Sequence, residues 1–172
     1  MGEKMKLNRK GFMLAEVVVS ASVVAVVLVT MYIGINRMTA AYDKRNRYYD
    51  LDAQQVAMEV NDLLKRDSEQ KLNNFTSLTD NYYSLEDIEN NYQVNYSELK
   101  DVFSSLGENI NTYYVKNEDG FNTMKSLNIN QSFKDYLDYF ISKTNFDENY
   151  SYFIVVELEK SSDYYYYTLK VK

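Results

Sequence analysis

Hydrophobic positions in this sequence are concentrated in one long run close to the N-terminus. Phe12 to Ile35 makes 24 residues, and Glu16 is the only one of them with a formal charge. Because a helix rises about 1.5 Å per residue, a run of this length spans a hydrocarbon core about 30 Å thick. Four basic residues precede the run: Lys4, Lys6, Arg9 and Lys10. The positive-inside rule therefore predicts a single-pass helix in the cytoplasmic membrane, with the N-terminus inside and the C-terminus outside.

Glu16 is the unusual residue in this run. A carboxylate at the centre of a bilayer costs about 2.5 to 3.5 kcal/mol, so it needs a partner or a function. No lysine or arginine lies between Phe12 and Asn36. A partner must come from another chain or from a group created by processing. Cleavage between Gly11 and Phe12 creates an amine at Phe12, about 6 Å from Glu16 along the helix.

An ordinary signal anchor or a secretory signal peptide is the alternative interpretation. The run is longer than the roughly 7 to 15 residues of a secretory hydrophobic region, and no small-x-small site marks an exit for cleavage. These two features, together with Glu16, argue against that alternative.

The segment Lys10-Gly11-Phe12-Met13-Leu14-Ala15-Glu16, followed by the Val/Ala run, resembles the class III signal sequence of type IV prepilins and pseudopilins. The resemblance implies that Arg9 and Lys10 belong to the recognised leader, that prepilin peptidase cleaves after Gly11, and that Phe12 is then N-methylated. It also assigns Leu14 and Glu16 to assembly, with Glu16 pairing with the Phe12 amine of a neighbouring subunit. The similarity covers residues 1 to about 66.

Two positions depart from the family pattern. Met13 stands where many members have threonine, and Ile33 stands where many major pilins have a helix-kinking proline. The chain has no proline at all. A minor pilin or pseudopilin of a type IV pilus, competence or type II secretion-like filament is therefore favoured over a major subunit. The implied partners are the prepilin peptidase, other pilin subunits, an assembly ATPase with its membrane platform protein, and membrane lipid.

Helical periodicity continues beyond the apolar run. Apolar residues recur at steps of 3, 4 or 7, and no proline or glycine interrupts the pattern from Asn36 to Asp67. The residues on this face are Met38, Tyr42, Tyr49, Ala53, Val56, Val60 and Leu63. The sequence therefore predicts four parts: a leader over 1–11, a membrane and polymerisation helix over 12–35, an amphipathic continuation of the same helix over 36–66, and an exterior domain over 67–172. The outer part of the stripe is expected to pack on that domain.

The exterior domain shows short, alternating signals. Residues 67–96 read mainly as loop with a short helix near Leu85, and a better helix begins at Ser97 and ends near Gly107. A hairpin is predicted around the turn Asn117 to Gly120. A helix is predicted from Ser132 to Lys143, with a capping-box start from Ser132 and Asp135.

Two strands close the chain, Tyr152 to Glu159 and a partner that ends at Val171, with one face on the core. The predicted fold class is therefore α+β, a long N-terminal helix on a small C-terminal antiparallel sheet with short helices, which is also what the resemblance implies.

Composition restricts the chemistry. The chain has 172 residues, a net charge of −6, and neither cysteine nor histidine. Disulfides, His-based triads, Cys nucleophiles and metal sites built on Cys or His are excluded. The leader carries a net +3, so the mature chain carries about −9, which disfavours direct nucleic-acid binding. Enzymatic activity, a cofactor and a metal are not predicted.

Three further features invite a function. The turn at Asn117 to Asp119 resembles calcium ligands only superficially, because the twelve-residue spacing is missing. The acid pairs Asp87/Glu89 and Glu157/Glu159 are read as solvated surface charge. Eighteen tyrosines could serve neighbouring subunits, a carbohydrate or a host surface, or only strand propensity. The tyrosines singled out lie at 82, 83, 113, 114, 164 and 166. A monomeric membrane-anchored binding module therefore stays open as the alternative function.

Overall fold

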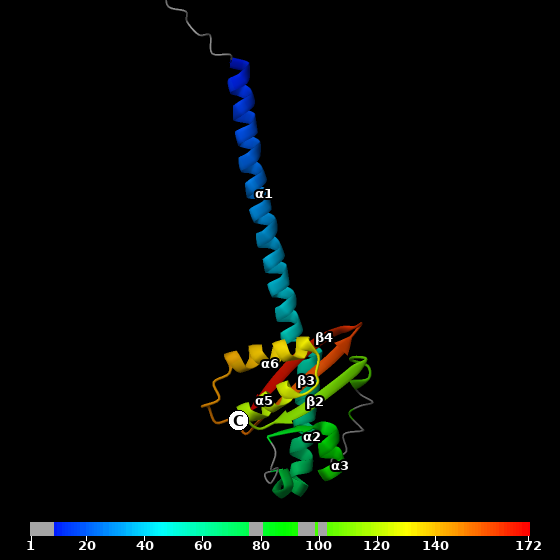
Figure 1. Ribbon diagram of the computed structural model, residues 1–172. Coiled ribbons are helices and arrows are strands. Elements are labelled where there is room, and N and C mark those ends of the chain that lie inside the picture. Colours follow the sequence, from blue (N-terminus) through cyan, green and yellow to red (C-terminus); the bar gives the residue numbers. More distant parts are fainter. Residues whose placement is uncertain (1–8, 76–80, 93–98, 100–102) are drawn as a thin grey trace, which may run out of the picture. The chain divides into compact units, whose positions relative to one another are not determined.

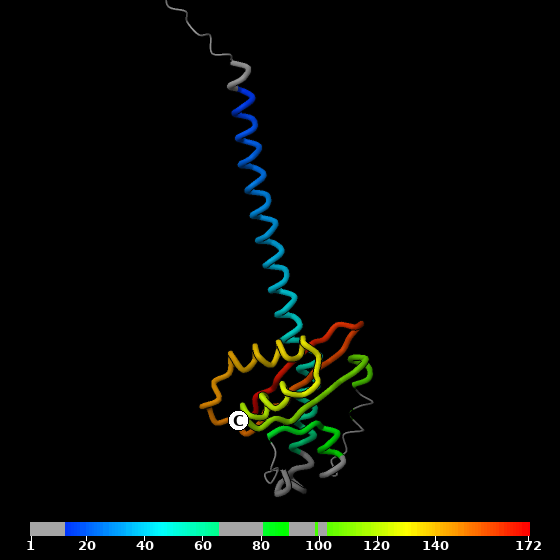
Figure 2. The backbone as a smooth tube through the Cα atoms, in the orientation of Figure 1, coloured from blue at the N-terminus to red at the C-terminus, as the bar shows by residue number. Residues whose placement is uncertain are grey.

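A computed structural model describes the backbone of residues 9–75, 81–92, 99 and 103–172, and the side chains of residues 13–65, 81–89, 99 and 103–172. Figure 2 draws the remaining residues in grey. The chain divides into two compact units, Met1–Lys44 and Arg45–Lys172.

The first unit consists of one helix over its described residues. Helix α1 (Arg9–Tyr48) runs through the whole predicted membrane segment without interruption and extends into the second unit. The absence of proline explains this continuity, because a mid-helix proline removes a backbone hydrogen bond and kinks the helix. Gly34 introduces no break, and a Cβ at this position would meet nothing within 4 Å.

Three hydroxyl groups of α1 are bonded to its own backbone. Ser22 Oγ donates to the Val18 carbonyl (2.7 Å), Thr30 Oγ1 to Val27 (2.8 Å), and Thr39 Oγ1 to Ile35 (3.1 Å). A polar group in lipid is costly when it lacks a hydrogen-bond partner. These bonds make the hydroxyl groups compatible with an apolar environment.

The helical path differs from the expected uninterrupted helix at Tyr49 and Asp50. Helix α2 (Leu51–Phe75) begins anew there and extends beyond the expected end at residue 66. The Asp50 carboxylate accepts from the backbone N–H of Asp52 (3.1 Å) and Ala53 (3.0 Å). This is the geometry of an N-cap, for which aspartate is among the preferred residues. The hydrophobic periodicity survives the break, which is why the sequence pattern did not reveal it.

The second unit contains the sheet of an α+β domain, which confirms the predicted fold class (Figure 1). The sheet has the order β1-β2-β3-β4, and every neighbouring pair is antiparallel. Its strands are β1 (Tyr82–Ser84), β2 (Asn109–Val115), β3 (Tyr152–Lys160) and β4 (Asp163–Val171). Strand β1 was not predicted, because three residues are too few to show a period of two.

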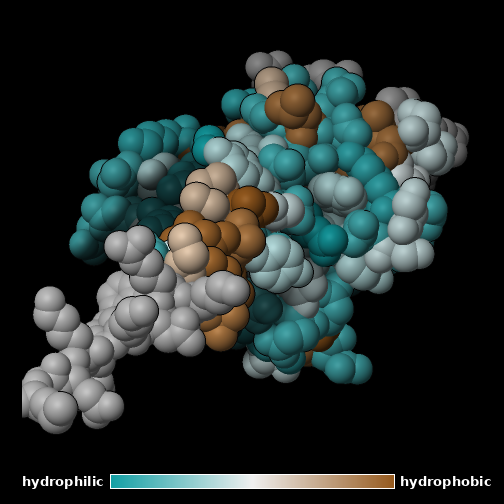
Figure 3. Space-filling view, turned by 90° about the horizontal axis from the view of Figure 1, so that it is seen from above, coloured by the Kyte–Doolittle hydropathy of each residue, from teal (hydrophilic) through white to brown (hydrophobic). Residues whose placement is uncertain are grey.

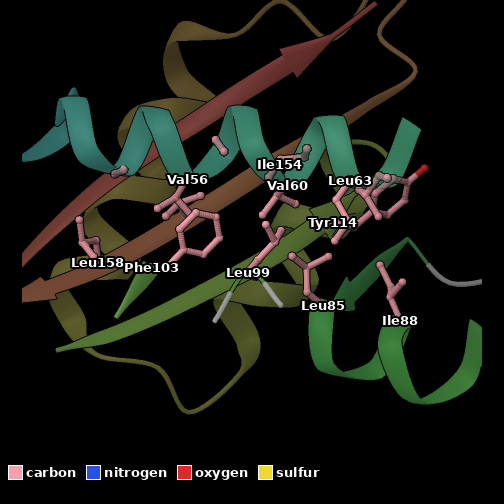
Figure 4. Packing of buried hydrophobic residues seen from close by; sticks show 14 of the residues in the cluster. Val56, Val60, Leu63, Leu85, Ile88, Leu99, Phe103, Tyr114, Ile154 and Leu158 are labelled. Atoms are coloured by element: carbon pink, nitrogen blue, oxygen red, sulfur yellow. The ribbon is translucent and has the colours of Figure 1, made fainter. Parts of the chain in front are cut away.

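One face of the sheet is covered by α2 and α3 (Leu85–Tyr92). Val56 and Val60 of α2 are fully buried, and in Figure 4 Val60 lies beside Ile154 of β3 while Val56 points toward Phe103. Leu63 is also buried, so the prediction that this stripe belongs to the core is confirmed. Ser84 caps α3 by a reciprocal pair of bonds with Asp87, because its Oγ accepts from Asp87 N (3.1 Å) while Asp87 Oδ2 accepts from Ser84 N (3.3 Å).

The opposite face of the sheet is covered by α5 (Glu118–Ser126) and α6 (Gln131–Lys143). Phe153 and Val155 of β3 are buried there. The expectation that the C-terminal hairpin has only one face on the core is therefore wrong. Strand β3 lies between two layers of helices, so alternate residues on both of its faces are apolar.

Two local predictions on this side are also corrected. The expected hairpin after Val115 is helix α5, because Asn117 is its N-cap and accepts from Gly120 N (3.1 Å). Helix α6 forms as predicted, but its cap is Asn130, whose Oδ1 accepts from Phe133 N (2.6 Å), rather than Ser132. Asparagine serves in turns and as an N-cap, so residue type alone did not separate the two. The helix predicted from Ser97 lies largely outside the described residues.

Ion pairs tie the end of α1 and the start of α2 to the C-terminal hairpin. Lys160 Nζ lies 2.9 Å from Asp50 Oδ1 and 2.5 Å from Asp52 Oδ2. Arg47 Nη2 donates to Asp163 Oδ1 (2.7 Å). Partial burial works to lower the pKa of Lys160, but the two carboxylates outweigh it and the pKa is raised. The cap residue Asp50 thus belongs to both the helix and the hairpin contact.

Candidate functional site

The predicted processing site lies in the first turns of α1. The backbone of Arg9, Lys10, Gly11 and Phe12 is helical, and the side chains of these four residues lie outside the described part of the chain. Phe12 precedes Glu16 by four residues on the same helix, which is a little more than one turn. The backbone therefore places the two positions on one face of α1.

Glu16 and Leu14 are exposed in the single chain, with Leu14 70% exposed. Among the described side chains, from Met13 onward, no cation pairs with Glu16. Its neighbours in sequence, Ala15 and Val17, carry no polar group. The carboxylate is therefore the one charged group described in an otherwise apolar stretch from Met13 to Ile35.

The surrounding surface of α1 is a continuous apolar one. In Figure 3 hydrophobic side chains gather in a brown patch. The exposed large apolar residues of this stretch are Met13, Leu14, Val17, Val18, Val19, Val23, Val24, Val26, Val27, Leu28, Val29, Met31, Tyr32, Ile33 and Ile35. An exposed apolar surface of this extent marks a site of contact with lipid or protein.

The length and composition of this helix fit a membrane span. Within the described residues, one helix is long and apolar enough to cross a membrane, and it lies near the N-terminus. The bounds of the predicted membrane segment, 12–35, stay a prediction.

The paired acids have different environments. Asp87 is exposed and caps α3, so it has a structural role. Glu157 is only 5% exposed, and its two carboxylate oxygens accept from Asn111 Nδ2 (3.0 Å) and Asn130 Nδ2 (2.6 Å). The interpretation of Glu157 as solvated surface charge is therefore wrong. Helix α6 and the loop before it cover this face of the sheet, which the strand pattern alone did not reveal.

Five of the six tyrosines singled out in the sequence fall into two groups, and the sixth, Tyr82, is half-buried with its ring centroid 5.7 Å from that of Tyr113. Tyr83, Tyr114 and Tyr166 are core residues. Burial raises the pKa of Tyr114 to about 12, and it also raises the pKa of Tyr166. Tyr113 and Tyr164 instead line a cavity of about 400 Å³ together with Glu157 and Glu159. These residues could be picked out individually from the sequence, but no local pattern indicates that strand register brings them together.

Metal binding has no support in the described residues. No group of three or more carboxylate residues lies close enough to hold an ion there. Asn117, Glu118 and Asp119 form the start of α5, where Asn117 Oδ1 is used as the cap.

Comparison with known proteins adds no family assignment. No protein-family model matches the sequence, and no curated protein or solved structure matches it either. The residues of α1 and of the sheet domain therefore carry the functional argument.

Proposed function

We propose that this protein is a type IV pilin-like subunit, a minor pilin or pseudopilin of a pilus, competence or type II secretion-like filament. It is inserted in the cytoplasmic membrane as a precursor with the C-terminus outside, cleaved after Gly11 by prepilin peptidase, and methylated at Phe12. It then joins a filament at the cell surface through α1. Its partners are other pilin subunits, the assembly ATPase and the membrane platform protein.

A single observation carries this proposal: Glu16 is an exposed carboxylate in an exposed, otherwise uncharged stretch of α1, four residues after the position that follows Gly11. A buried charge is tolerated when an opposite charge neutralises it. The amine of Phe12 from a neighbouring copy supplies that charge, and the Val-rich surface of α1 supplies apolar contact area. The pair then fixes the axial register between adjacent helices.

Mass spectrometry of the native protein tests the processing step. The expected N-terminus is Phe12, carrying one methyl group, with residues 1–11 removed. Gly11→Ala tests the cleavage site, since it changes the residue before the bond while leaving the apolar run intact. Recovery of the native chain with residues 1–11 attached, in cells where other pilins are trimmed, would refute the proposal.

Substitution of Glu16 tests assembly. Glu16→Ala and Glu16→Gln remove the charge and should leave insertion and cleavage intact, because an uncharged residue is cheaper in lipid. Both variants should be absent from filaments sheared from the cells. Ser20→Ala, one turn further along α1, is the matched control and should enter filaments normally.

The alternative function, a monomeric membrane-anchored binding module, is favoured by the cavity at Glu157 and Glu159. It is distinguished by the same variants. A monomeric anchor inserts as well or better without Glu16 and is never recovered in a filament fraction.

A further inference from the structure

A polar cavity of about 400 Å³ opens at one end of the sheet, on the face covered by α5 and α6. Strands β2, β3 and β4 supply its floor, and the segment between α5 and α6 supplies one wall. We call it the notch, and its lining residues are Asn109, Asn111, Tyr113, Asn128, Ile129, Asn130, Glu157, Glu159 and Tyr164.

Strand register builds the floor of the notch. Asn109 pairs with Glu159, and Glu159 pairs with Tyr164 on the other side. The neighbouring row is Asn111 with Glu157. Residues directly opposite in antiparallel strands lie on the same face. The result is two parallel rows in which an amide lies beside a carboxylate.

Hydrogen bonds hold these side chains in place before any ligand arrives. Asn109 Nδ2 donates to Glu159 Oε2 (2.7 Å), and Asn111 Nδ2 donates to Glu157 Oε2 (3.0 Å). Asn130 Nδ2 reaches Glu157 Oε1 (2.6 Å) from the wall, while its Oδ1 caps α6. Preorganisation of this kind lowers the entropy that a ligand must lose on binding.

The lining selects against anions. It contains two carboxylates and neither lysine nor arginine. The carboxylate of Glu159 raises the pKa of Tyr164, so this hydroxyl adds no charge to the lining. A phosphate or an acidic sugar therefore finds no cationic partner in the notch.

A neutral, hydroxyl-rich ligand fits better than a cation. Each carboxylate already accepts an amide N–H, which fixes its orientation in the notch. An asparagine amide has two N–H donors and an oxygen acceptor, so after one bond it can still engage a hydroxyl, which both donates and accepts. Tyr113 and Tyr164 add rings that can contact the C–H face of a sugar. The volume falls within the range of small-molecule sites, about 300 to 1,000 Å³.

We propose that the notch binds a neutral carbohydrate, one pyranose unit of an exterior glycan. The amides of Asn109 and Asn111 and the carboxylate of Glu159 bond the hydroxyls, and Tyr164 packs on the ring. Glu157, which is buried, acts by positioning Asn111 and Asn130. This goes beyond the proposed assembly function and does not depend on it.

Saturation-transfer NMR with the full chain in phosphatidylcholine nanodiscs tests the proposal, since nanodiscs avoid detergents that carry sugar headgroups. The probes are methyl α-D-glucopyranoside, methyl α-D-mannopyranoside, methyl β-D-galactopyranoside and N-acetyl-D-glucosamine. At least one should bind at millimolar concentration, with little dependence on salt.

Variants locate the binding and separate a sugar from a cation. Asn109→Ala should weaken binding about fivefold to tenfold through one lost hydrogen bond. Asn122→Ala, an exposed asparagine of α5 outside the notch, should not change it. Glu159→Gln keeps an acceptor oxygen and should weaken sugar binding by less than about tenfold. Unchanged thermal midpoints confirm that the variants are folded.

Three outcomes overturn the proposal. The first is that none of the four sugars binds. The second is that Asn109→Ala and Asn122→Ala bind equally well, which places the sugar elsewhere. The third is that L-lysinamide binds while no sugar does, and that either Glu159→Gln or added salt abolishes this binding. That result would make the notch a cation site.

Discussion

Asn130 performs two functions that one substitution can separate. Its Oδ1 caps α6 by accepting from Phe133 N (2.6 Å), and its Nδ2 donates to the buried Glu157 carboxylate (2.6 Å). Asn130→Asp keeps a capping oxygen and puts a second carboxylate oxygen where the donor was. Asn130→Ser keeps a cap of similar quality and removes the donor without adding charge. The two variants therefore differ chiefly in charge.

The expected magnitudes follow from the geometry. Losing the hydrogen bond to the Glu157 carboxylate costs about 1.5 to 3 kcal/mol in Asn130→Ser. Two unit charges 2.6 Å apart repel by about 6 kcal/mol at an effective dielectric constant of about 20, and side-chain relaxation reduces this. We expect Asn130→Asp to be at least about 2 kcal/mol less stable than Asn130→Ser at neutral pH. That difference corresponds to a melting temperature lower by about 8 °C for a domain of this size.

The pH dependence identifies the cause. Crowding two carboxylates raises the pKa of the pair in the folded state of Asn130→Asp. A raised folded pKa means that the stability is present below the unfolded pKa, about 4, and is lost as pH rises. The gap between the two variants should therefore nearly close at about pH 4 and widen toward pH 7.

Thermal unfolding of the full chain in detergent micelles, followed by the near-ultraviolet circular dichroism of the packed tyrosines, measures the gap. Equal melting temperatures for the two variants at pH 7 would refute the reasoning. The same conclusion follows from a gap that does not change between pH 4 and pH 7, because charge repulsion must titrate.

Three further predictions concern the cap, the buried hydroxyls and a close backbone approach. Asp50→Ala should lower the free energy of unfolding by about 2 kcal/mol, because both the helix cap and the ion pair with Lys160 are lost. Asp50→Asn keeps the cap and should lower it by less than about 1 kcal/mol, so equal melting temperatures for the two variants would contradict this. Burial raises the pKa of Tyr114 to about 12, so the folded state keeps a proton that the unfolded state releases above about pH 10, and stability should fall by up to about 3 kcal/mol as pH rises from 10 to 12. In a pH titration, tyrosinate absorbance should therefore rise in two steps, the exposed tyrosines first and the buried ones together with unfolding. A single step near pH 10 with the fold intact would contradict this prediction. Gly120→Ala should lower the stability of the folded domain even though alanine favours helices, because the new Cβ would overlap the backbone oxygen of Asn81 and lie 2.6 Å from Val115 Cγ1. Calorimetry measures this against the control Asn122→Ala, which should be neutral or slightly stabilising.

Long, strongly periodic segments were predicted well from the sequence. The apolar run, the stripe of Val56, Val60 and Leu63, helix α6 and the β3–β4 hairpin all appear in the structure. In each case the hydrophobic pattern is long enough to identify the element without knowledge of its neighbours.

The errors lie where one residue type serves two purposes. Asn117 reads equally well as a turn or as an N-cap, and the distinction depends on whether Phe121 packs in a helix against the sheet, as it does here. The interruption at Asp50 leaves the periodic pattern intact. Burial of Glu157 depends on a wall contributed by Asn130, 27 residues away in sequence. Each of these features depends on contacts between residues far apart in the chain or leaves the hydrophobic pattern unchanged, so a local sequence pattern does not predict it.

The candidate assembly site and the notch differ in the same way. Glu16 is conspicuous in the sequence because it is a charge in an apolar run. The notch consists of ordinary polar residues from separate strands, and only the register of β2, β3 and β4 gathers them. The tyrosines and acids are visible in the sequence, but their adjacency in the fold is not.

The interruption at Tyr49 and Asp50 also bears on how far a local unwinding of α1 can spread. Tyr49 N still bonds the Arg45 carbonyl (3.1 Å), whereas the amides of Asp52 and Ala53 turn to the Asp50 side chain. Helix unwinding spreads from residue to residue through consecutive backbone bonds. Because that series is broken here, unwinding that begins in α1 does not pass into α2 from one backbone bond to the next, and the first turn of α2 keeps its own support. The sheet domain therefore keeps the helix that packs on it even when the end of α1 frays.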